Sequence, residues 1–308
     1  MILCCGEALI DMLPRETKTG EAAFAPHAGG AIFNTAIALG RLGAPAGMLT
    51  GLSSDMFGAL LKDGLAASDV DTGHLIISDR PTTLAFVKLV EGHASYSFYD
   101  ENSAGRMLQA QDLPQLSGDV SALYFGGISL ACEPAADAYA ALQAAHAGRL
   151  PVMIDPNIRP GFIADEARYR DRLAGMIAGC DIMKVSDEDL HWLIPGDSSA
   201  ADKARGMLDR GPQVVVLTEG AQGARAFLKD GRDVQAAAQK VDVVDTVGAG
   251  DTFNAGVLAD LAQQGCLSKA ALASITPEQM KRALQFGARV AAVTVSRAGA
   301  NPPWASEL

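Results

Sequence analysis

Short apolar runs alternate with stretches of helical periodicity along most of the chain. Residues 2–6 form an apolar run that ends in glycine, which is typical of a buried strand. Residues 30–42 then repeat apolar side chains at helical spacing, and Gly43 and Pro45 are signals that end a helix. The same alternation predicts further strands at residues 46–52, 121–127, 151–156, 181–186, 213–220 and 223–231, and helices at residues 55–68, 133–147, 165–178, 200–209, 251–264 and 277–295.

Strands separated by helices of this length predict βαβ units, which form a parallel sheet with helices on both faces. One segment breaks the alternation. Residues 82–90 and 94–100 read as two β runs around a short turn that contains Gly92, which predicts a hairpin. This hairpin either extends an edge of the main sheet or forms a small separate sheet that acts as a lid.

The composition of the 308 residues, 49% apolar and 20% charged, is that of an ordinary globular protein of one or two domains. Its net charge is −11 and no cluster of Lys and Arg is present, so we do not expect a nucleic-acid partner. The chain contains no signal peptide and no apolar run near the ~20 residues that span a bilayer. The five cysteines show no CxxC spacing, and we therefore expect reduced thiols and a cytoplasmic location, with no membrane partner.

The most informative segment is the turn formed by Gly248, Ala249, Gly250 and Asp251. Residues 240–244 read as a β run, and the small residues of the turn then lead into a helix. Exposed backbone amides and the positive end of a helix dipole together bind an anion. Asp251 either caps the helix or is a base for a hydroxyl that attacks a phosphoryl group. The residues alone leave both roles open.

Two other kinds of glycine-rich phosphate site are excluded, and so is one hydrolase motif. The chain contains no GxxxxGK[ST] sequence, as a P-loop requires. A dinucleotide-binding turn needs a small residue at the position of Phe253. There is also no GxSxG sequence, which excludes the common serine-hydrolase elbow.

The segment DTVGAGDTFNAG resembles the C-terminal signature of the ribokinase-like carbohydrate kinases of the phosphofructokinase-B type. GGAIFNTAIALGRLG, at residues 29–43, resembles their N-terminal signature, and the resemblance extends over nearly the whole chain. It implies one domain, residues 1–308, built as a three-layer α/β/α sandwich with a mainly parallel sheet and a small β lid at about residues 12–27 and 74–100. It also implies that ATP phosphorylates a sugar hydroxyl.

The resemblance assigns roles to single residues. Asp251 becomes the base, and the amides of Gly248, Ala249 and Gly250 stabilise the transferring phosphoryl group. On the sugar side it implies that the positions binding hydroxyl groups are Asp11, Gly29, Gly30 and Asn34.

On the nucleotide side, TEGAQG resembles a loop that contacts phosphate and ribose through Thr218, Gly220 and Gly223. Lys184 either faces the nucleotide phosphates or is a solvated strand-end lysine. KVSDEDL resembles the magnesium-binding Asn-x-x-Glu segment of the family, with Ser186 in place of Asn. This substitution leaves open whether Glu188 or Asp189 serves Mg²⁺.

A monovalent-cation site is frequent in this family and uses Asp245, the Val247 carbonyl and residues near the C-terminus. Pro303 stands where a side-chain oxygen is often found and offers no hydroxyl, which argues against a need for potassium. Lid hairpins of this family often pair between subunits, so the resemblance also implies a homodimer formed through the lid.

DPNIRP, at residues 155–160, resembles the DxNxR segment of bacterial fructokinases and 2-keto-3-deoxygluconate kinases. Arg159 either binds substrate oxygens or caps a turn at the surface, and Phe98 either lines the lid or packs against its neighbouring strand. We expect a fructokinase acting on the 6-hydroxyl. The alternatives are a 2-keto-3-deoxygluconate kinase, in which Arg106 or Arg159 grips the substrate carboxylate, and a non-catalytic sugar or nucleotide sensor.

Overall fold

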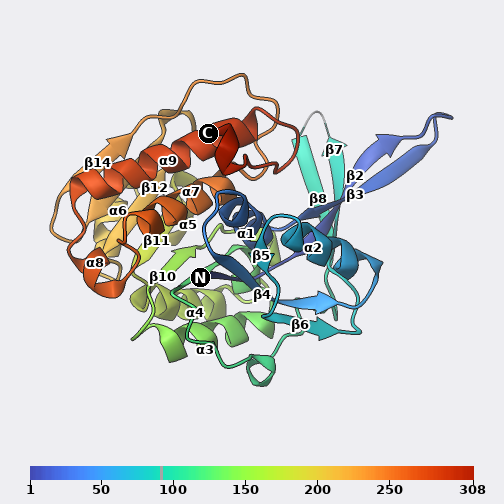
Figure 1. The fold of residues 1–308 in the computed structure, drawn as a ribbon, viewed down its shortest axis with the longest axis horizontal. Coiled ribbons are helices and arrows are strands. Elements are labelled where there is room, and N and C mark those ends of the chain that lie inside the picture. Colours follow the sequence, from blue (N-terminus) through green and yellow to red (C-terminus); the bar gives the residue numbers. More distant parts are fainter. Residues whose placement is uncertain (91–92) are drawn as a thin grey trace.

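A computed structural model describes residues 1–90 and 93–308 of the chain and contains two separate sheets (Figure 1). The larger sheet has the strand order β14-β13-β12-β11-β10-β9-β1-β4-β5, and β6 also pairs with β4. Every neighbouring pair from β12 to β5 is parallel, whereas β13 and β14 add two antiparallel strands at one edge. The mainly parallel sheet predicted from the sequence is confirmed.

The strands of the larger sheet are β1 (Ile2–Cys5), β4 (Ala46–Ser53), β5 (Val70–Asp71), β6 (Leu75–Ser78), β9 (Ala122–Gly126), β10 (Val152–Asp155), β11 (Ile182–Ser186), β12 (Val214–Thr218), β13 (Ala224–Leu228) and β14 (Asp233–Ala236). The helices are α1 (Ala31–Arg41), α2 (Met56–Ala66), α3 (Ala135–His146), α4 (Glu166–Ala178), α5 (Asp187–Leu193), α6 (Ala200–Leu208), α7 (Ala249–Gln263), α8 (Lys269–Ala273) and α9 (Pro277–Val295).

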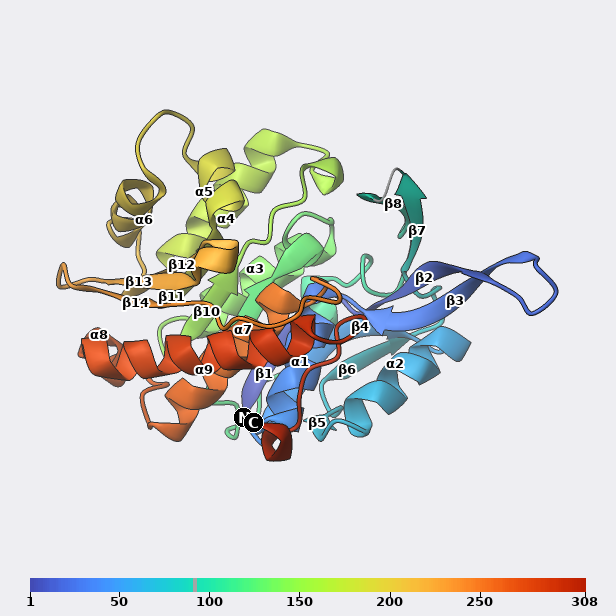
Figure 2. The same ribbon diagram turned by 90° about the horizontal axis from the view of Figure 1, so that it is seen from above.

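Helices cover both faces of the larger sheet, as the view from above shows (Figure 2). Successive side chains of a strand point to opposite faces, and β1 divides accordingly: Ile2 and Cys4 pack into one core, whereas Leu3 and Cys5 pack into the other. The first core contains side chains of α1, α2, α7, α8 and α9, and the second contains those of α3, α4, α5 and α6. The fold is therefore a three-layer α/β/α sandwich.

Capping residues set where several helices begin. Thr276 accepts a hydrogen bond from the Gln279 amide, and the Gln279 side chain bonds back to the Thr276 amide, with Pro277 in the first turn. This reciprocal arrangement satisfies two amides that have no partner inside the helix. It places α9 at the bounds expected from periodicity. Asp55 caps α2 in a similar way through the amides of Phe57 and Gly58.

The smaller sheet has the order β3-β2-β7-β8 and is formed by β2 (Leu9–Glu16), β3 (Ala22–Gly29), β7 (Leu84–Val90) and β8 (His93–Tyr99). It projects from the body of the molecule on one side (Figure 1). The predicted hairpin is thus part of a separate sheet, and its turn at residues 91–92 lies outside the described residues. The predicted lid segment 74–100 begins too early, because β6 pairs with β4 and belongs to the larger sheet.

The β run predicted at residues 240–244 is wrong. The segment is not a strand, and the side chains of Val241, Val243 and Val244 are exposed. The segment follows β14, which is the last strand in the chain and the edge strand of the larger sheet. The Val244 amide donates instead to the Val295 carbonyl at the end of α9. Alternating apolar residues form a strand only where a neighbouring strand takes their backbone hydrogen bonds.

All five cysteines are buried and unpaired, as expected for reduced thiols. No helix in the described part of the chain combines the length and apolar character that a membrane-spanning segment needs.

Candidate active site

A cavity of about 340 Å³ lies at the carboxyl ends of the central strands. In open parallel sheets ligands bind beyond these ends, at the point where the strand order reverses. Here that point is β1, with β9 on one side and β4 on the other. The cavity is lined by these residues singled out from the sequence: Asp11, Gly30, Asn34, Phe98, Arg159, Lys184, Gly248, Ala249, Gly250 and Asp251.

Asp251 lies in the first turn of α7 with its side chain buried against the cavity. Asn34 Nδ2 donates to Asp251 Oδ2 at 2.9 Å, and Thr35 Oγ1 donates to the Asp251 carbonyl at 3.1 Å. Burial raises the pKa of Asp251 to about 7, and the Asn34 hydrogen bond opposes this shift. A carboxyl group with a pKa near neutrality accepts a proton more readily than an ordinary aspartate, which suits a general base.

Gly248 begins α7 in the left-handed conformation, with φ 77°, and a Cβ there would lie 2.6 Å from the Cβ of Ala300. Only glycine fits this position without strain. The amide of Ala249 donates to the Thr246 carbonyl at 3.3 Å. Because α7 begins at this turn and the turn lines the cavity, the positive end of the helix dipole faces the cavity.

Lys184 extends from β11 toward the same turn. Its Nζ lies 2.9 Å from Asp155 Oδ2 and 3.5 Å from where a Cβ on Gly250 would be. The lysine is 5% exposed and therefore is not the solvated strand-end lysine of the alternative interpretation. Asn254 Nδ2 donates to the same Asp155 oxygen at 2.7 Å, while Asp155 Oδ1 has no hydrogen-bond partner among the described residues. A fixed cation and an open carboxylate oxygen thus adjoin the N-terminus of α7.

Asp11 lies on β2 of the smaller sheet, opposite the N-terminus of α1. Burial raises the pKa of Asp11 to about 6. A Cβ on Gly29 would lie 2.3 Å from Asp11 Oδ2, and one on Gly30 would lie 3.0 Å from the Glu7 carbonyl. Gly29 does not line the cavity itself, and its lack of a side chain makes room for the Asp11 carboxylate.

Glu7, which follows β1, was missed in the sequence analysis. Its Oε1 accepts from the Ala31 amide at 3.0 Å, and its Oε2 accepts from Ser129 Oγ at 2.7 Å. These bonds join the start of α1 to the chain after β9. Burial raises the pKa of Glu7, while the Ser129 hydrogen bond lowers it. An acidic residue directly after a buried strand was the available signal.

A second wall of the cavity comes from the loop after β10. Asn157, with a positive φ of 42°, lines the cavity together with Arg159 and Phe162. The ring centroids of Phe162 and Phe98 lie 4.3 Å apart at an interplanar angle of 73°. Phe98 therefore joins the smaller sheet to this loop across the cavity mouth.

The two acidic candidates for magnesium differ sharply. Glu188 is exposed, whereas Asp189 is buried in the first turn of α5. Asp189 Oδ1 accepts from the Ile158 amide at 3.0 Å, which holds the loop after β10. Burial and the nearby Asp155 carboxylate raise the pKa of Asp189, and Lys184 lowers it.

The predicted nucleotide loop follows β12. Thr218 ends that strand, Gly220 has a φ of 53°, and Gly223 has a φ of 100°. None of these three residues lines the 340 Å³ cavity within the described chain, and neither do Glu188 and Asp189. The structure therefore brings together the sugar and phosphate candidates, and leaves this loop outside the cavity.

Asp245 precedes the glycine-rich turn. Its Oδ1 accepts from the Val247 amide at 3.0 Å, and its Oδ2 accepts from the Gly299 amide at 2.9 Å. Pro303 is buried in the C-terminal segment. Backbone amides thus bind both carboxylate oxygens.

Comparison with known proteins places the chain in a family. The chain matches the pfkB family of carbohydrate kinases over residues 1–307. It is 52% identical to a fructokinase of Rhizobium leguminosarum bv. trifolii over 91% of this chain and 86% of that protein.

Solved structures agree with the sequence relatives. Fructokinase of Xylella fastidiosa with bound ATP superposes with a TM-score of 0.89 at 31% identity, over 97% of this chain and 93% of that one. Fructokinase of Vibrio cholerae O395 in its fructose-, ADP- and calcium-bound form gives 0.81 at 25% identity, over 97% and 94%. The chain belongs to the pfkB family of carbohydrate kinases, and it is a sugar kinase with the ribokinase-like fold.

Proposed function

We propose that the protein transfers the terminal phosphoryl group of ATP to the 6-hydroxyl of D-fructose. The observation that carries the proposal is Asp251, buried in the first turn of α7 and facing the cavity with its pKa raised to about 7. The 52% identical fructokinase supports fructose as the acceptor.

In this proposal Asp251 accepts the proton of the attacking hydroxyl. Asn34 holds one oxygen of the Asp251 carboxylate, so that the carboxylate cannot rotate away from the sugar. Asp11 and the Gly30 backbone bind other sugar hydroxyls, because carboxylates and carbonyls accept the hydrogen bonds that hydroxyls donate. The amides of Gly248 and Gly250 and the Lys184 ammonium bind the phosphoryl oxygens as negative charge accumulates on them, whereas the Ala249 amide donates to the Thr246 carbonyl.

The residues present fit MgATP. Asp155 Oδ1 is a buried acceptor without a partner among the described residues, and burial together with the neighbouring Asp155 carboxylate raises the pKa of Asp189. Two carboxylates in one partly buried region favour a divalent cation. We assign Mg²⁺ to Asp155 and Asp189, partly through waters, and the nucleotide to Lys184, Thr218, Gly220 and Gly223. Bound magnesium would neutralise phosphate charge during transfer.

We further propose that residues 1–308 act as one kinase unit in which the smaller sheet is the lid. Phe98 supports this role because its strand reaches the cavity mouth and its ring contacts Phe162. A closed lid excludes water, which otherwise competes with the sugar as phosphoryl acceptor.

The test is ADP release with MgATP across fructose, 2-keto-3-deoxygluconate, ribose and nucleosides. We expect the highest kcat/KM with fructose and a product phosphorylated on the 6-hydroxyl. Higher kcat/KM with 2-keto-3-deoxygluconate would favour the alternative in which Arg159, which lines the cavity, binds a carboxylate. Binding of sugar and ATP without turnover on any acceptor would indicate the sensor instead.

Three further proposals concern the potassium requirement, the oligomeric state and the cellular location. Turnover does not require potassium, because Pro303 offers no hydroxyl where a side-chain oxygen often completes the cation site of this family. Equal turnover in sodium and potassium buffers is the expected result.

The lid also joins two copies into a homodimer, since its residues Phe24 and Tyr99 are 48% and 60% exposed. Sedimentation would detect the dimer. The unpaired cysteines support a cytoplasmic location.

A further inference from the structure

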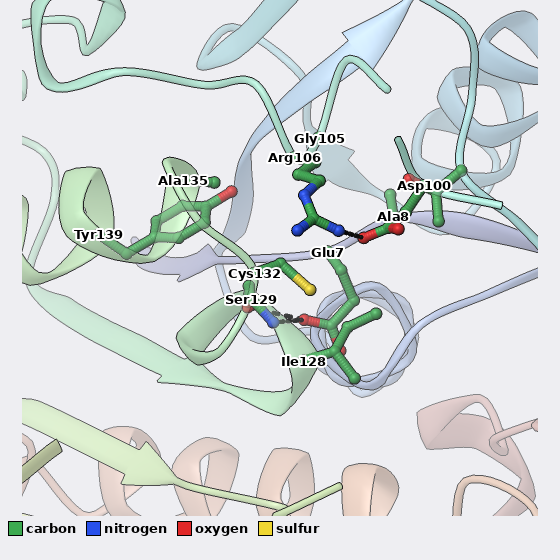
Figure 3. Close-up of a pocket in the computed structure, with 11 residues that line it drawn as sticks. Glu7, Ala8, Asp100, Gly105, Arg106, Ile128, Ser129, Cys132, Ala135 and Tyr139 are labelled. Carbon is green, nitrogen blue, oxygen red and sulfur yellow. Dashed lines mark hydrogen bonds and ion pairs between the residues drawn. The ribbon is translucent and has the colours of Figure 1, made fainter. Parts of the chain in front are cut away.

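A small cavity of about 20 Å³ adjoins the large cavity, with which it shares Glu7. Figure 3 shows the residues that line the small cavity. Its volume is about that of a site for one water molecule. Arg106 and Asp100 form one wall, and Glu7, Ser129 and Cys132 form another. Glu7 also lines the large cavity, so this cluster lies directly behind the groups that surround the sugar.

Asp100 and Arg106 form an ion pair in this small cavity. Arg106 Nη1 lies 2.8 Å from Asp100 Oδ2, and the side chains are 32% and 10% exposed respectively. Asp100 directly follows β8 and stands two residues after Phe98. Arg106 was considered from the sequence as a grip for a substrate carboxylate, but it does not line the large cavity and its charge is already paired.

The ion pair belongs to a network that ties both strands of the β7–β8 hairpin to one short segment, residues 103–106. Thr83, which precedes β7, donates from Oγ1 to Ser103 Oγ at 2.8 Å. The Arg106 amide donates to the same Ser103 oxygen at 3.2 Å. The segment therefore touches the hairpin at the base of both strands.

Arg106 also joins this segment to the body of the protein. Its Nε donates to the Glu133 carbonyl at 3.2 Å, and its own carbonyl accepts from the Ala135 amide at 3.1 Å. Glu133 and Ala135 lie at the start of α3, which packs on the larger sheet. One side chain thus connects the base of the lid with a helix of the body.

We propose that Arg106 is a positioning residue that, through Asp100, holds β8 and its Phe98 over the bound sugar. The inference rests on the proposed function, because it assigns the hairpin the role of closing over the acceptor. The Arg106 charge does not touch the substrate. Its loss frees the base of β8, so sugar binding weakens and water gains access to the phosphoryl group.

The test compares Arg106→Gln, Arg106→Lys and the wild-type protein for fructose KM, ATP KM, kcat and the ratio of ADP to fructose phosphate formed. For Arg106→Gln we expect fructose KM to rise about tenfold and ATP KM to change less than about twofold. We also expect ADP to exceed fructose phosphate, because water becomes an acceptor. Arg106→Lys keeps the charge and restores the values toward wild type.

Lys269→Gln is the matched control. Lys269 pairs with Asp181 at 2.8 Å, and their side chains are 32% and 9% exposed, nearly the same as in the Arg106 pair. The Lys269–Asp181 pair lies away from the lid, where α8 meets the start of β11. Lys269→Gln should therefore lower stability without changing the ratio of ADP to fructose phosphate. Asp100→Asn repeats the test if Arg106→Gln is not recovered folded, since it removes the negative charge that pairs with Arg106 while nearly preserving the size of the side chain.

Wild-type fructose KM and product ratio in the Arg106→Gln or Asp100→Asn variant would overturn the proposal. The same changes in Lys269→Gln would also overturn it, because a general loss of stability would then explain them. Failure of the proposed function is distinguishable, since the wild-type protein itself would then not phosphorylate fructose.

Discussion

The proposed sugar end and the proposed nucleotide end of the site differ in how far their side chains are buried and held by hydrogen bonds within the protein. At the sugar end Asn34, Asp251 and Glu7 are buried, and hydrogen bonds fix their polar groups. At the nucleotide end Gly220 and Glu188 are exposed, and the loop after β12 lies outside the cavity lining.

This difference follows from what each end has to do. A base must be held in one geometry and shielded from water, because misplacement of the reacting groups costs rate directly. Burial also raises the pKa of Asp251, which adapts it to accept a proton. The groups proposed to bind the nucleotide sit on an open loop, where backbone and side chains can adjust around a ligand. The comparison predicts larger effects on turnover at the sugar end.

Asp251→Asn is the strongest test of this contrast. We expect kcat to fall by about 10³-fold or more, because the variant cannot accept the hydroxyl proton. Fructose and ATP binding, measured by calorimetry, should stay within a few-fold of wild type. Activity within about tenfold of wild type would show that Asp251 is not the base.

The same substitution should stabilise the protein at alkaline pH. The folded-state pKa of Asp251 is raised from 3.8 to about 7, so its contribution to stability is present below pH 3.8 and is lost as the pH rises through 7. Asn avoids a buried charge at pH 8. Thermal melts should therefore give a higher Tm for the variant at pH 8, and a much smaller difference at pH 4.

The pH profile tests the sugar end without mutation. Asp251 must be ionised to act as a base, so log kcat/KM for fructose should fall with unit slope below about pH 7. Asp11, with its pKa raised to about 6, adds a second unit of slope below that pH if its carboxylate binds the sugar. A profile flat from pH 8 to pH 5 would contradict both assignments.

Gly29→Ala separates sugar binding from nucleotide binding. The new Cβ would meet Asp11 Oδ2 at 2.3 Å and displace the carboxylate. We expect fructose KM to rise about tenfold with ATP KM unchanged. Gly175→Ala is the control, since this α4 glycine has open space around it and alanine should raise stability by about 1 kcal/mol. Equal rises in both KM values would contradict the division into two ends.

The smallest effects are expected for Asp189 and Glu188, which lie in the first turn of α5. Asp189→Asn keeps an acceptor for the Ile158 amide but removes a charge, so the Mg²⁺ concentration for half-maximal turnover should rise several-fold. Glu188→Gln should change it less than about twofold, because Glu188 is exposed. Magnesium titrations at fixed ATP provide the measurement, and a larger effect at Glu188 would reverse the assignment.

Periodicity and the two signature segments predicted most of the fold, and many of the residues singled out from the sequence line the same cavity. Helix α9 begins and ends where the apolar spacing and Pro277 indicated, since its amphipathic pattern and capping box act locally. The run at residues 240–244 misled for the opposite reason. Its valines have strand-like spacing, and only the edge of the sheet decides whether a partner strand is present.

Residues of the candidate site divide in the same way, into those that the sequence identifies and those that only the fold identifies. Asp251, Gly248 and Asn34 stand in local motifs whose chemistry is visible in the sequence. Glu7 stands in none of the motifs quoted, and Asp155 begins the DPNIRP segment but was given no role from it, because the contacts of both residues depend on which strands become neighbours. Asp155 approaches Lys184 only because β10 and β11 pair in parallel, which brings residues 29 positions apart to 2.9 Å.

The sequence by itself determined the alternation of strands and helices, the glycine turns and the position of the candidate base Asp251, because short-range spacing and backbone sterics encode them. Only the tertiary structure decided that the lid is a separate sheet and that burial raises the pKa of Asp251. It also decided that Arg106 pairs with Asp100 behind the site. Burial, ion pairing and pKa depend on groups distant in the chain, which folding alone brings within interaction range.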